Sequence, residues 1–201
     1  MQAKDREPSI HFHREQIATY GAGTVEALGW RAPASQRLRF EAIAQAADFE
    51  DASVLDAGCG TGDLKRFLDQ RFAGVRYTGV EQMPEFIAKA RERYAGDASA
   101  SFIEGDFNTI ALPRAEHVVA SGVFAYRTAN PRYVEETVAR LHAAATRTLI
   151  FNLLDARVFP SHTQLMGRDV DAVLAFCRQL SDDVRVIDDY ADDDVTVVVR
   201  I

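Results

Sequence analysis

The chain has 201 residues and a formal net charge of −7, with 47% hydrophobic and 26% charged residues. This length and composition predict one globular domain with a substantial core. Lysine and arginine never occur in a run of three, which disfavours nucleic acid as a partner because phosphate contacts need clustered basic groups. The two cysteines, Cys59 and Cys177, are too few for a disulfide framework or a zinc cluster. The sequence shows no recognisable secretory leader and no apolar run near ~18 residues, so we expect no membrane association and a cytoplasmic location. We also expect no metal site.

The N-terminal region carries two helical patterns. Residues 1–9 are polar and are expected to fray, and a short helix is expected over 10–20 before a glycine-containing loop. A second helix is predicted from Ser35 to about Asp48, with Leu38 and Phe40 among its inward side chains.

A strand, a glycine-rich turn and a helix follow. The apolar run 53–57 predicts a buried strand containing Asp56, and apolar spacing predicts a helix over about 62–72. Between them, three glycines (58, 60 and 62) alternate with small residues, so a ligand can approach the backbone closely. The start of the helix also leaves unpaired N–H groups at this turn. The pattern therefore predicts a polar ligand.

The flanking residues narrow the choice of ligand. A phosphate-binding Walker loop is excluded because Asp63-Leu64 follows Gly62, and a dinucleotide fingerprint would need glycine at position 63. Acids at 56 and 63 disfavour a pyrophosphate and favour a cation. The next predicted strand, 75–80, ends in Glu81, which can accept hydrogen bonds from ribose hydroxyls. A nucleoside with a cationic tail fits best, and S-adenosylmethionine has this combination.

The rest of the chain alternates strands and helices, which predicts right-handed crossovers and a parallel sheet. Helices are expected from Pro84, from Asn130-Pro131 and over 168–180, with strands at 100–104, 116–121, 148–152, 184–187 and 195–199. The last two strands read as an antiparallel pair. Their aspartate-rich connection, 188–194, is expected to be solvated.

Three segments resemble the class I S-adenosylmethionine-dependent methyltransferases: VLDAGCGTGDL (54–64), TGVEQMPEFIAKAR (78–91) and FIEGDF (102–107). The resemblance implies an α/β, Rossmann-like, doubly wound fold with a seven-stranded, mostly parallel sheet and an antiparallel last strand. It also implies an N-terminal helical lid over residues 1–49 and a cofactor-binding core over 50–201. The expected activity is methyl transfer from S-adenosylmethionine.

The resemblance and the strand ends together suggest a cofactor site. Asp106 would lie beside the adenine, Ser121 beside the transferred methyl, and Arg39 is a candidate partner for the cofactor carboxylate. The expected cofactor-binding residues are Asp56, Ala57, Gly58, Cys59, Gly60, Gly62, Glu81, Gln82, Met83, Gly105, Asp106, Phe107, Ser121, Gly122 and Arg39.

The acceptor side is less defined. Tyr126, Phe124, Asn152 and Trp30 are candidates for the substrate pocket, and no catalytic residue is assigned because methyl transfer works mainly by positioning. The segment SGVF after the fourth strand lacks the Asn-Pro-Pro-Tyr-type signature of base methylation. The expected lid and the apolar and aromatic residues favour a small-molecule acceptor. The alternative is a cofactor-binding module without transferase activity. The sequence predicts neither the acceptor atom nor an oligomeric state.

Overall fold

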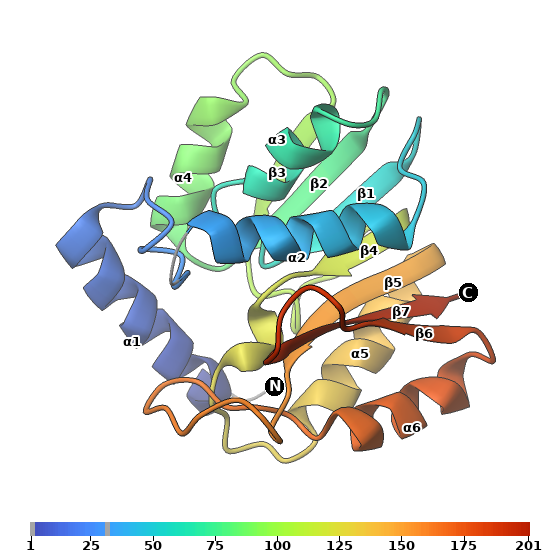
Figure 1. The fold of residues 1–201 in the computed structure, drawn as a ribbon. Coiled ribbons are helices and arrows are strands. Elements are labelled where there is room, and N and C mark those ends of the chain that lie inside the picture. The colour runs from blue at the N-terminus through green and yellow to red at the C-terminus, as the bar shows by residue number, and fades with distance from the viewer. Residues whose placement is uncertain (1–2, 31–32) are drawn as a thin grey trace.

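The computed structural model describes residues 3–30 and 33–201, and its centre is one sheet of seven strands in the order β3-β2-β1-β4-β5-β7-β6 (Figure 1). The strands are β1 (Ser53–Ala57), β2 (Arg76–Glu81), β3 (Ala100–Glu104), β4 (Ala115–Ala120), β5 (Ala145–Leu154), β6 (Val184–Ile187) and β7 (Asp194–Arg200). Strand β7 pairs antiparallel with both of its neighbours, and the other pairings are parallel. The expected doubly wound sheet with an antiparallel last strand is confirmed.

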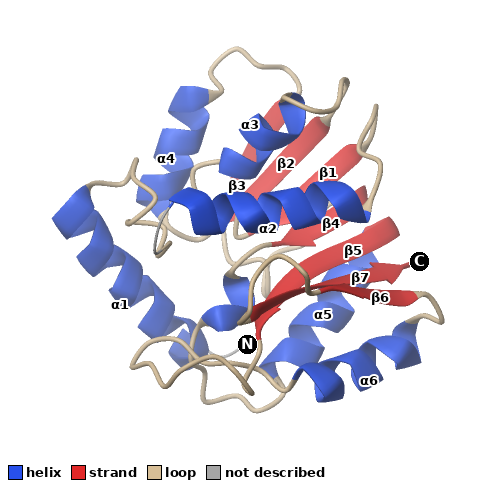
Figure 2. Ribbon diagram, viewed as in Figure 1, coloured by secondary structure: helices blue, strands red, loops and turns tan. Residues whose placement is uncertain are grey.

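Helices cover both faces of the sheet (Figure 2). Helices α2 (Pro33–Ala46), α3 (Asp63–Asp69) and α4 (Pro84–Arg93) contribute to one apolar core, and α5 (Tyr133–Ala144) and α6 (Val170–Leu180) to the other. Strands β1, β4 and β5 are buried along most of their length because both of their faces are covered. Helix α1 (Ala3–Tyr20) lies outside these two layers.

The site is located by the switch in strand order between β1 and β4. The chain winds outward from β1 to β3, returns to pair β4 beside β1, and then winds outward in the other direction. The connections leaving these two strands therefore diverge and leave a crevice at their carboxyl ends. Glu81 ends β2 at this edge, and the glycine turn, Asp106 and Ser121 follow the ends of β1, β3 and β4.

The N-terminal helices differ from expectation in two ways. Helix α1 begins at Ala3 rather than near residue 10; residues 1–2 of the stretch expected to fray lie outside the described residues. Its early turns are held because the Ser9 hydroxyl accepts a hydrogen bond from Gln82 at 3.3 Å. In α2, Phe40 is buried but Leu38 is 43% exposed. Two positions along a helix is a rotation of about 200°, so the two side chains face opposite ways.

The expected division into a lid (1–49) and a core (50–201) stays a prediction. Phe40 and Ile43 of α2 are buried in the same apolar cluster as Val54 of β1. Helix α2 is therefore packed as a layer of the α/β body, and α1 with the following loop is the part that stands apart. Within the described ranges, no helix has the length and apolar character needed to cross a membrane.

Candidate functional site

The turn after β1 requires glycine for two reasons. Gly58, Gly60 and Gly62 have φ values of 81°, 55° and 77°, which side chains other than hydrogen disfavour. A Cβ at Gly58 would lie 2.5 Å from Val123 Cγ1, and one at Gly60 would lie 2.6 Å from Leu28 Cδ2. The glycine backbone of this turn therefore packs between the loop that follows β4 and the loop that follows α1, where a side chain would not fit.

Glu81 anchors this turn to the end of β2. Its Oε2 accepts a hydrogen bond from the Gly60 N–H at 3.0 Å, and its Oε1 accepts one from the Met83 N–H at 2.8 Å. The side chain is 7% exposed, and burial raises the pKa of its carboxyl, while these backbone hydrogen bonds act in the opposite direction.

Asp56 is a second buried acid beside the turn. Its Oδ2 accepts the Tyr77 hydroxyl at 2.5 Å, and its Oδ1 has no hydrogen-bond partner among the described residues. Burial raises the pKa of Asp56 to about 7; the Tyr77 hydrogen bond opposes this shift and the charge of Glu81 adds to it. A cation placed here would favour the ionised form of both carboxyls.

Asp63 contributes less to this acidity than its sequence position suggests. Its Oδ1 accepts hydrogen bonds from Arg93 at 2.7 Å and from Arg66 at 3.2 Å. These partners compensate its charge, so the electrostatic preference of the turn depends on Asp56 and Glu81.

A polar network joins the ends of β4, β5 and β7. The Gly122 N–H donates to Asn152 Oδ1 at 2.7 Å, and Asn152 Nδ2 donates to Asp194 Oδ1 at 3.0 Å. Asp194 also accepts from Tyr190 and forms an ion pair with Arg39. The Arg39 guanidinium lies over the Trp30 ring, 4.7 Å from its centroid.

The expectation that the whole aspartate-rich connection is solvated is wrong for Asp194, which is only 3% exposed. Three side chains, from α2, from β5 and from the connection itself, bind this carboxylate, and these partners compensate the cost of its burial.

These groups surround one cavity. It is lined by thirteen of the expected residues: Asp56, Gly58, Cys59, Gly60, Glu81, Gln82, Asp106, Phe107, Ser121, Gly122, Arg39, Tyr126 and Trp30. Ala57, Gly62, Met83, Gly105, Phe124 and Asn152 do not line it. Phe124 is fully buried against Phe151, and Asn152 acts from behind the wall through Gly122.

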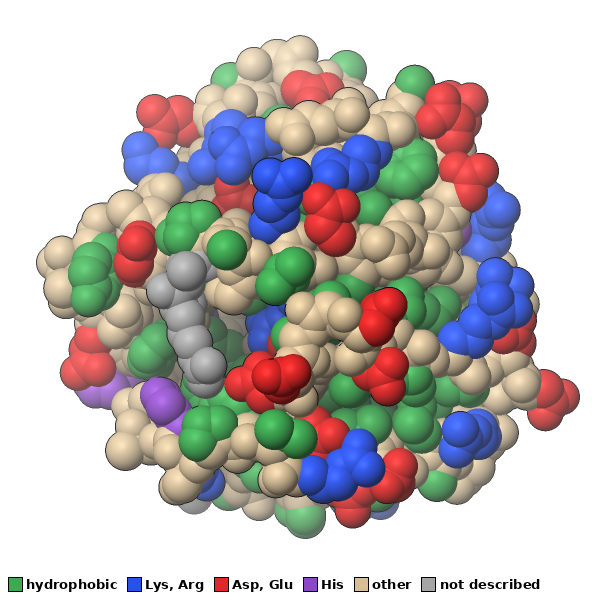
Figure 3. All heavy atoms as spheres, viewed as in Figure 1, with side chains coloured by type: hydrophobic (Ala, Val, Ile, Leu, Met, Phe, Trp, Pro, Cys, Tyr) green, Lys and Arg blue, Asp and Glu red, His purple; other side chains and the backbone are tan. Residues whose placement is uncertain are grey.

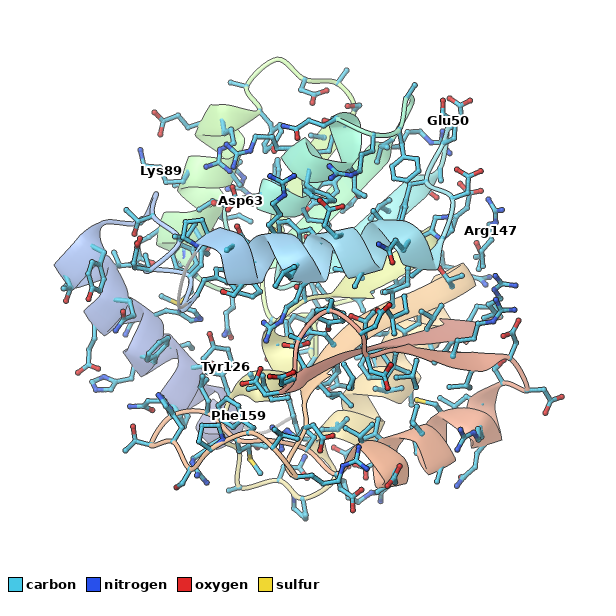
Figure 4. All side chains as sticks on the ribbon, viewed as in Figure 1. Glu50, Asp63, Lys89, Tyr126, Arg147 and Phe159 are labelled. Carbon is cyan, nitrogen blue, oxygen red and sulfur yellow. The ribbon has the colours of Figure 1, made fainter. Side chains whose placement is uncertain are left out.

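The cavity also contains residues that the sequence analysis did not single out. Phe159, Leu165 and Tyr190 line the cavity, as does His13 of α1, whose Nε2 lies 2.8 Å from the Tyr126 hydroxyl. Figure 4 shows Tyr126 beside α1. No sequence signal links His13 to Tyr126, because 113 positions separate them. Among the side chains of residues 8–30 and 33–201, no cluster of three His, Cys, Asp or Glu could hold a metal.

Residues 54–148 match the family model described as a methyltransferase domain. The chain is 34% identical to the putative methyltransferase Rv1506c of Mycobacterium tuberculosis over 157 residues, which cover 74% of this chain and 92% of that protein. The chain belongs to the class I S-adenosylmethionine-dependent methyltransferases.

Other methyltransferases are similar over shorter or more divergent stretches. Trans-aconitate 2-methyltransferase of Rhodopseudomonas palustris is 31% identical over 58% of this chain, which spans 43% of that relative. The crystal structure of magnesium protoporphyrin IX methyltransferase from Synechocystis PCC 6803 shares the fold, with a TM-score of 0.64, 16% identity and 83% of each chain covered. The resemblance drawn from the three motifs is confirmed.

Proposed function

We propose that this methyltransferase binds S-adenosylmethionine in the cavity at the switch point and transfers its methyl group to a small molecule. The main support for this proposal is the pair of buried acids, Asp56 and Glu81, beside a turn whose glycines leave the backbone accessible. A diphosphate would be repelled there, whereas the sulfonium of S-adenosylmethionine would be attracted.

The residues of the cavity fit this cofactor. Each Glu81 oxygen retains a second lone pair for a ribose hydroxyl, and Asp106 with Phe107 lines the cavity where the adenine would lie. Two buried polar atoms, Asp56 Oδ1 and Ser121 Oγ, have no protein partner among the described residues, so a ligand can satisfy them. Arg39 would meet the cofactor carboxylate from the wall, oriented by Asp194.

The chain contributes to transfer by positioning. The bound cofactor supplies an activated methyl group, and displacement at that carbon needs the acceptor atom held in line on the side away from the sulfur. The wall formed by Trp30, Tyr126 and Phe159 excludes water from that side. This extended cavity favours a transferase over the alternative, a binding module without activity, since binding alone would not need an acceptor compartment.

Calorimetry with S-adenosylhomocysteine tests the cofactor site. Glu81→Gln should weaken binding by about 1–3 kcal/mol, because charge-assisted hydrogen bonds to the ribose are lost. Glu104→Gln is a matched control, since Glu104 ends β3 in register with Glu81 but is exposed. Equal affinities for the two variants would contradict the assignment, and single turnover with labelled cofactor would separate transferase from binding module.

The expected partners and location stay predictions. On the face drawn in Figure 3, basic side chains are interspersed with acidic ones, which agrees with the expectation that nucleic acid is not the acceptor. The expected cytoplasmic location requires a fractionation experiment.

A further inference from the structure

A hydrogen-bonded pair joins α1 to the loop after β4 at the wall of the cavity. The Tyr126 hydroxyl lies 2.8 Å from His13 Nε2, and His13 Nδ1 lies 3.0 Å from the carbonyl oxygen of Ala27. A carbonyl oxygen only accepts, so Nδ1 carries a proton. Burial lowers the pKa of His13 and so favours the neutral imidazole, in which Nε2 accepts the hydrogen bond of the Tyr126 hydroxyl.

Packing holds both side chains in place. The His13 ring meets Phe86 edge-on, with centroids 5.3 Å apart, and Arg168 donates to the Tyr126 carbonyl oxygen at 2.7 Å. Gly29 leaves room for the pair, since a Cβ there would lie 3.2 Å from the Tyr126 hydroxyl oxygen. Burial lowers the pKa of His13, which keeps a proton-accepting imidazole available at neutral pH.

The rest of the acceptor compartment is aromatic and apolar, with contributions from Trp30, Leu154, Phe159, Leu165 and Tyr190. Among its described lining residues, the cations are Arg39, which Asp194 binds, and Arg127, which donates to the His162 carbonyl oxygen at 2.8 and 2.9 Å. The two carboxylates of this lining, Asp193 and Asp194, balance the two guanidinium groups in formal charge, so a polycarboxylate gains no net electrostatic attraction here. An uncharged planar molecule suits this compartment better.

We propose that the acceptor is an uncharged aromatic compound bearing a phenolic hydroxyl, and that Tyr126 and His13 take up the proton of that hydroxyl as it is methylated. This inference rests on the proposed function of methyl transfer from S-adenosylmethionine.

The step balances within the cavity. The phenol oxygen forms a bond to the methyl carbon, and the carbon–sulfur bond breaks with its electron pair remaining on sulfur. The phenol proton passes to Tyr126 while the Tyr126 proton passes to His13 Nε2. Positive charge thus moves from the sulfonium to the imidazolium, so the net charge of the cavity is unchanged, and His13 later releases the proton to solvent.

Two phenols separate proton acceptance from a structural role. At pH 8, 4-methylphenol is still protonated, whereas 4-nitrophenol is largely ionised and needs no base. In His13→Gln, the glutamine oxygen can still accept the Tyr126 hydrogen bond but cannot take up a proton. Single turnover with methyl-labelled S-adenosylmethionine should be slower by about 100-fold for 4-methylphenol and close to the wild-type rate for 4-nitrophenol.

His11→Gln is the matched control, because His11 lies on the same helix but is exposed and pairs with Glu15. It should leave both rates unchanged. Trp30, the only tryptophan of the chain, reports acceptor binding through quenching of its fluorescence by 4-nitrophenol in protein loaded with S-adenosylhomocysteine. That titration should give the same affinity for the wild type and for His13→Gln.

Three outcomes would overturn the inference. Equal rate losses for the two phenols would make the His13–Tyr126 contact structural only. Label appearing on trans-aconitate or on a primary amine, but on neither phenol, would refute the acceptor class, as would binding of S-adenosylhomocysteine without transfer to either phenol. Failure of the wild type to bind S-adenosylhomocysteine would instead contradict the proposed function.

Discussion

The environment of Asp56 in the folded protein is not evident from its position in the sequence. In sequence it is an acid at the end of an apolar strand; in the structure its Oδ1 is buried at the cavity with no partner among the described residues. Because burial raises its pKa to about 7, the ionised form is costly unless a cation is present. The affinity for a positively charged ligand should therefore depend on pH through the ionisation of Asp56.

We predict that S-adenosylmethionine binds more tightly at pH 8 than at pH 6, by roughly 5–10-fold, because ionised Asp56 attracts the sulfonium. S-adenosylhomocysteine lacks that charge, so its affinity should change by less. Asp56→Asn should remove most of the difference between the two ligands in calorimetry. A pH dependence shared by both ligands would contradict this assignment.

The same carboxyl should destabilise the ligand-free protein at high pH. Its pKa is about 7 when folded against an ordinary value of 3.8, so between these values the folded state binds more protons than the unfolded state. The free energy of unfolding therefore falls as pH rises from about 4 to 7. Asp56→Asn should be more stable than the wild type at pH 8 by ~1–3 kcal/mol in urea denaturation, and nearly equal at pH 5. Lower stability of the variant at pH 8 would refute this.

At the scale of elements, the turn after β1 connects this strand to α3 and also lines the cavity. We predict that Gly58→Ala is destabilised by more than 1 kcal/mol, because it combines a φ of 81° with a Cβ only 2.5 Å from Val123. Gly96→Ala separates the two effects, since Gly96 has a φ of 87° but open space around it. It should lose about 1 kcal/mol from the backbone alone. Similar losses in urea denaturation would show that the contact with Val123 is unimportant.

The chain of hydrogen bonds from Gly122 through Asn152 to Asp194 gives a second example at this scale. It fixes the loop after β4 against β5 and β7, and it orients Arg39 of α2. Gly122 lies in the loop after β4, Asn152 lies within β5 and Asp194 begins β7, so residue identity alone does not predict that they meet. The pairing of β5 with β7 places Leu154 opposite Asp194 and thereby brings these groups together.

At the scale of the whole molecule, ligand binding should raise the free energy of unfolding. S-adenosylhomocysteine at 100 times its dissociation constant should stabilise the folded state by ~2.7 kcal/mol. For a chain of 201 residues this corresponds to about 5–10 °C in thermal denaturation. NAD should give no shift, because its diphosphate would face the buried acids. A shift with NAD or ATP, but none with S-adenosylhomocysteine, would overturn the cofactor assignment.

The sequence by itself determined the sheet and gathered the acids and glycines of the predicted cofactor site at one edge of it. Local sequence signals are sufficient for both. Apolar runs predict the strands, and glycine at 58, 60 and 62 predicts the turn. The acids lie at or near the ends of strands, and these ends share one edge of a parallel sheet. The predicted strand 53–57 and the antiparallel final pair agree with β1, β6 and β7.

Only the tertiary structure decided which distant residues meet at the wall of the cavity. His13 meets Tyr126 across 113 positions, and Arg39 meets Asp194 across 155. No periodicity or spacing encodes such contacts, because they depend on where α1 and α2 pack against the sheet. The burial of Asp194 has the same origin: an acidic run is normally solvated, and the folded chain alone supplies the three donors that make its burial favourable.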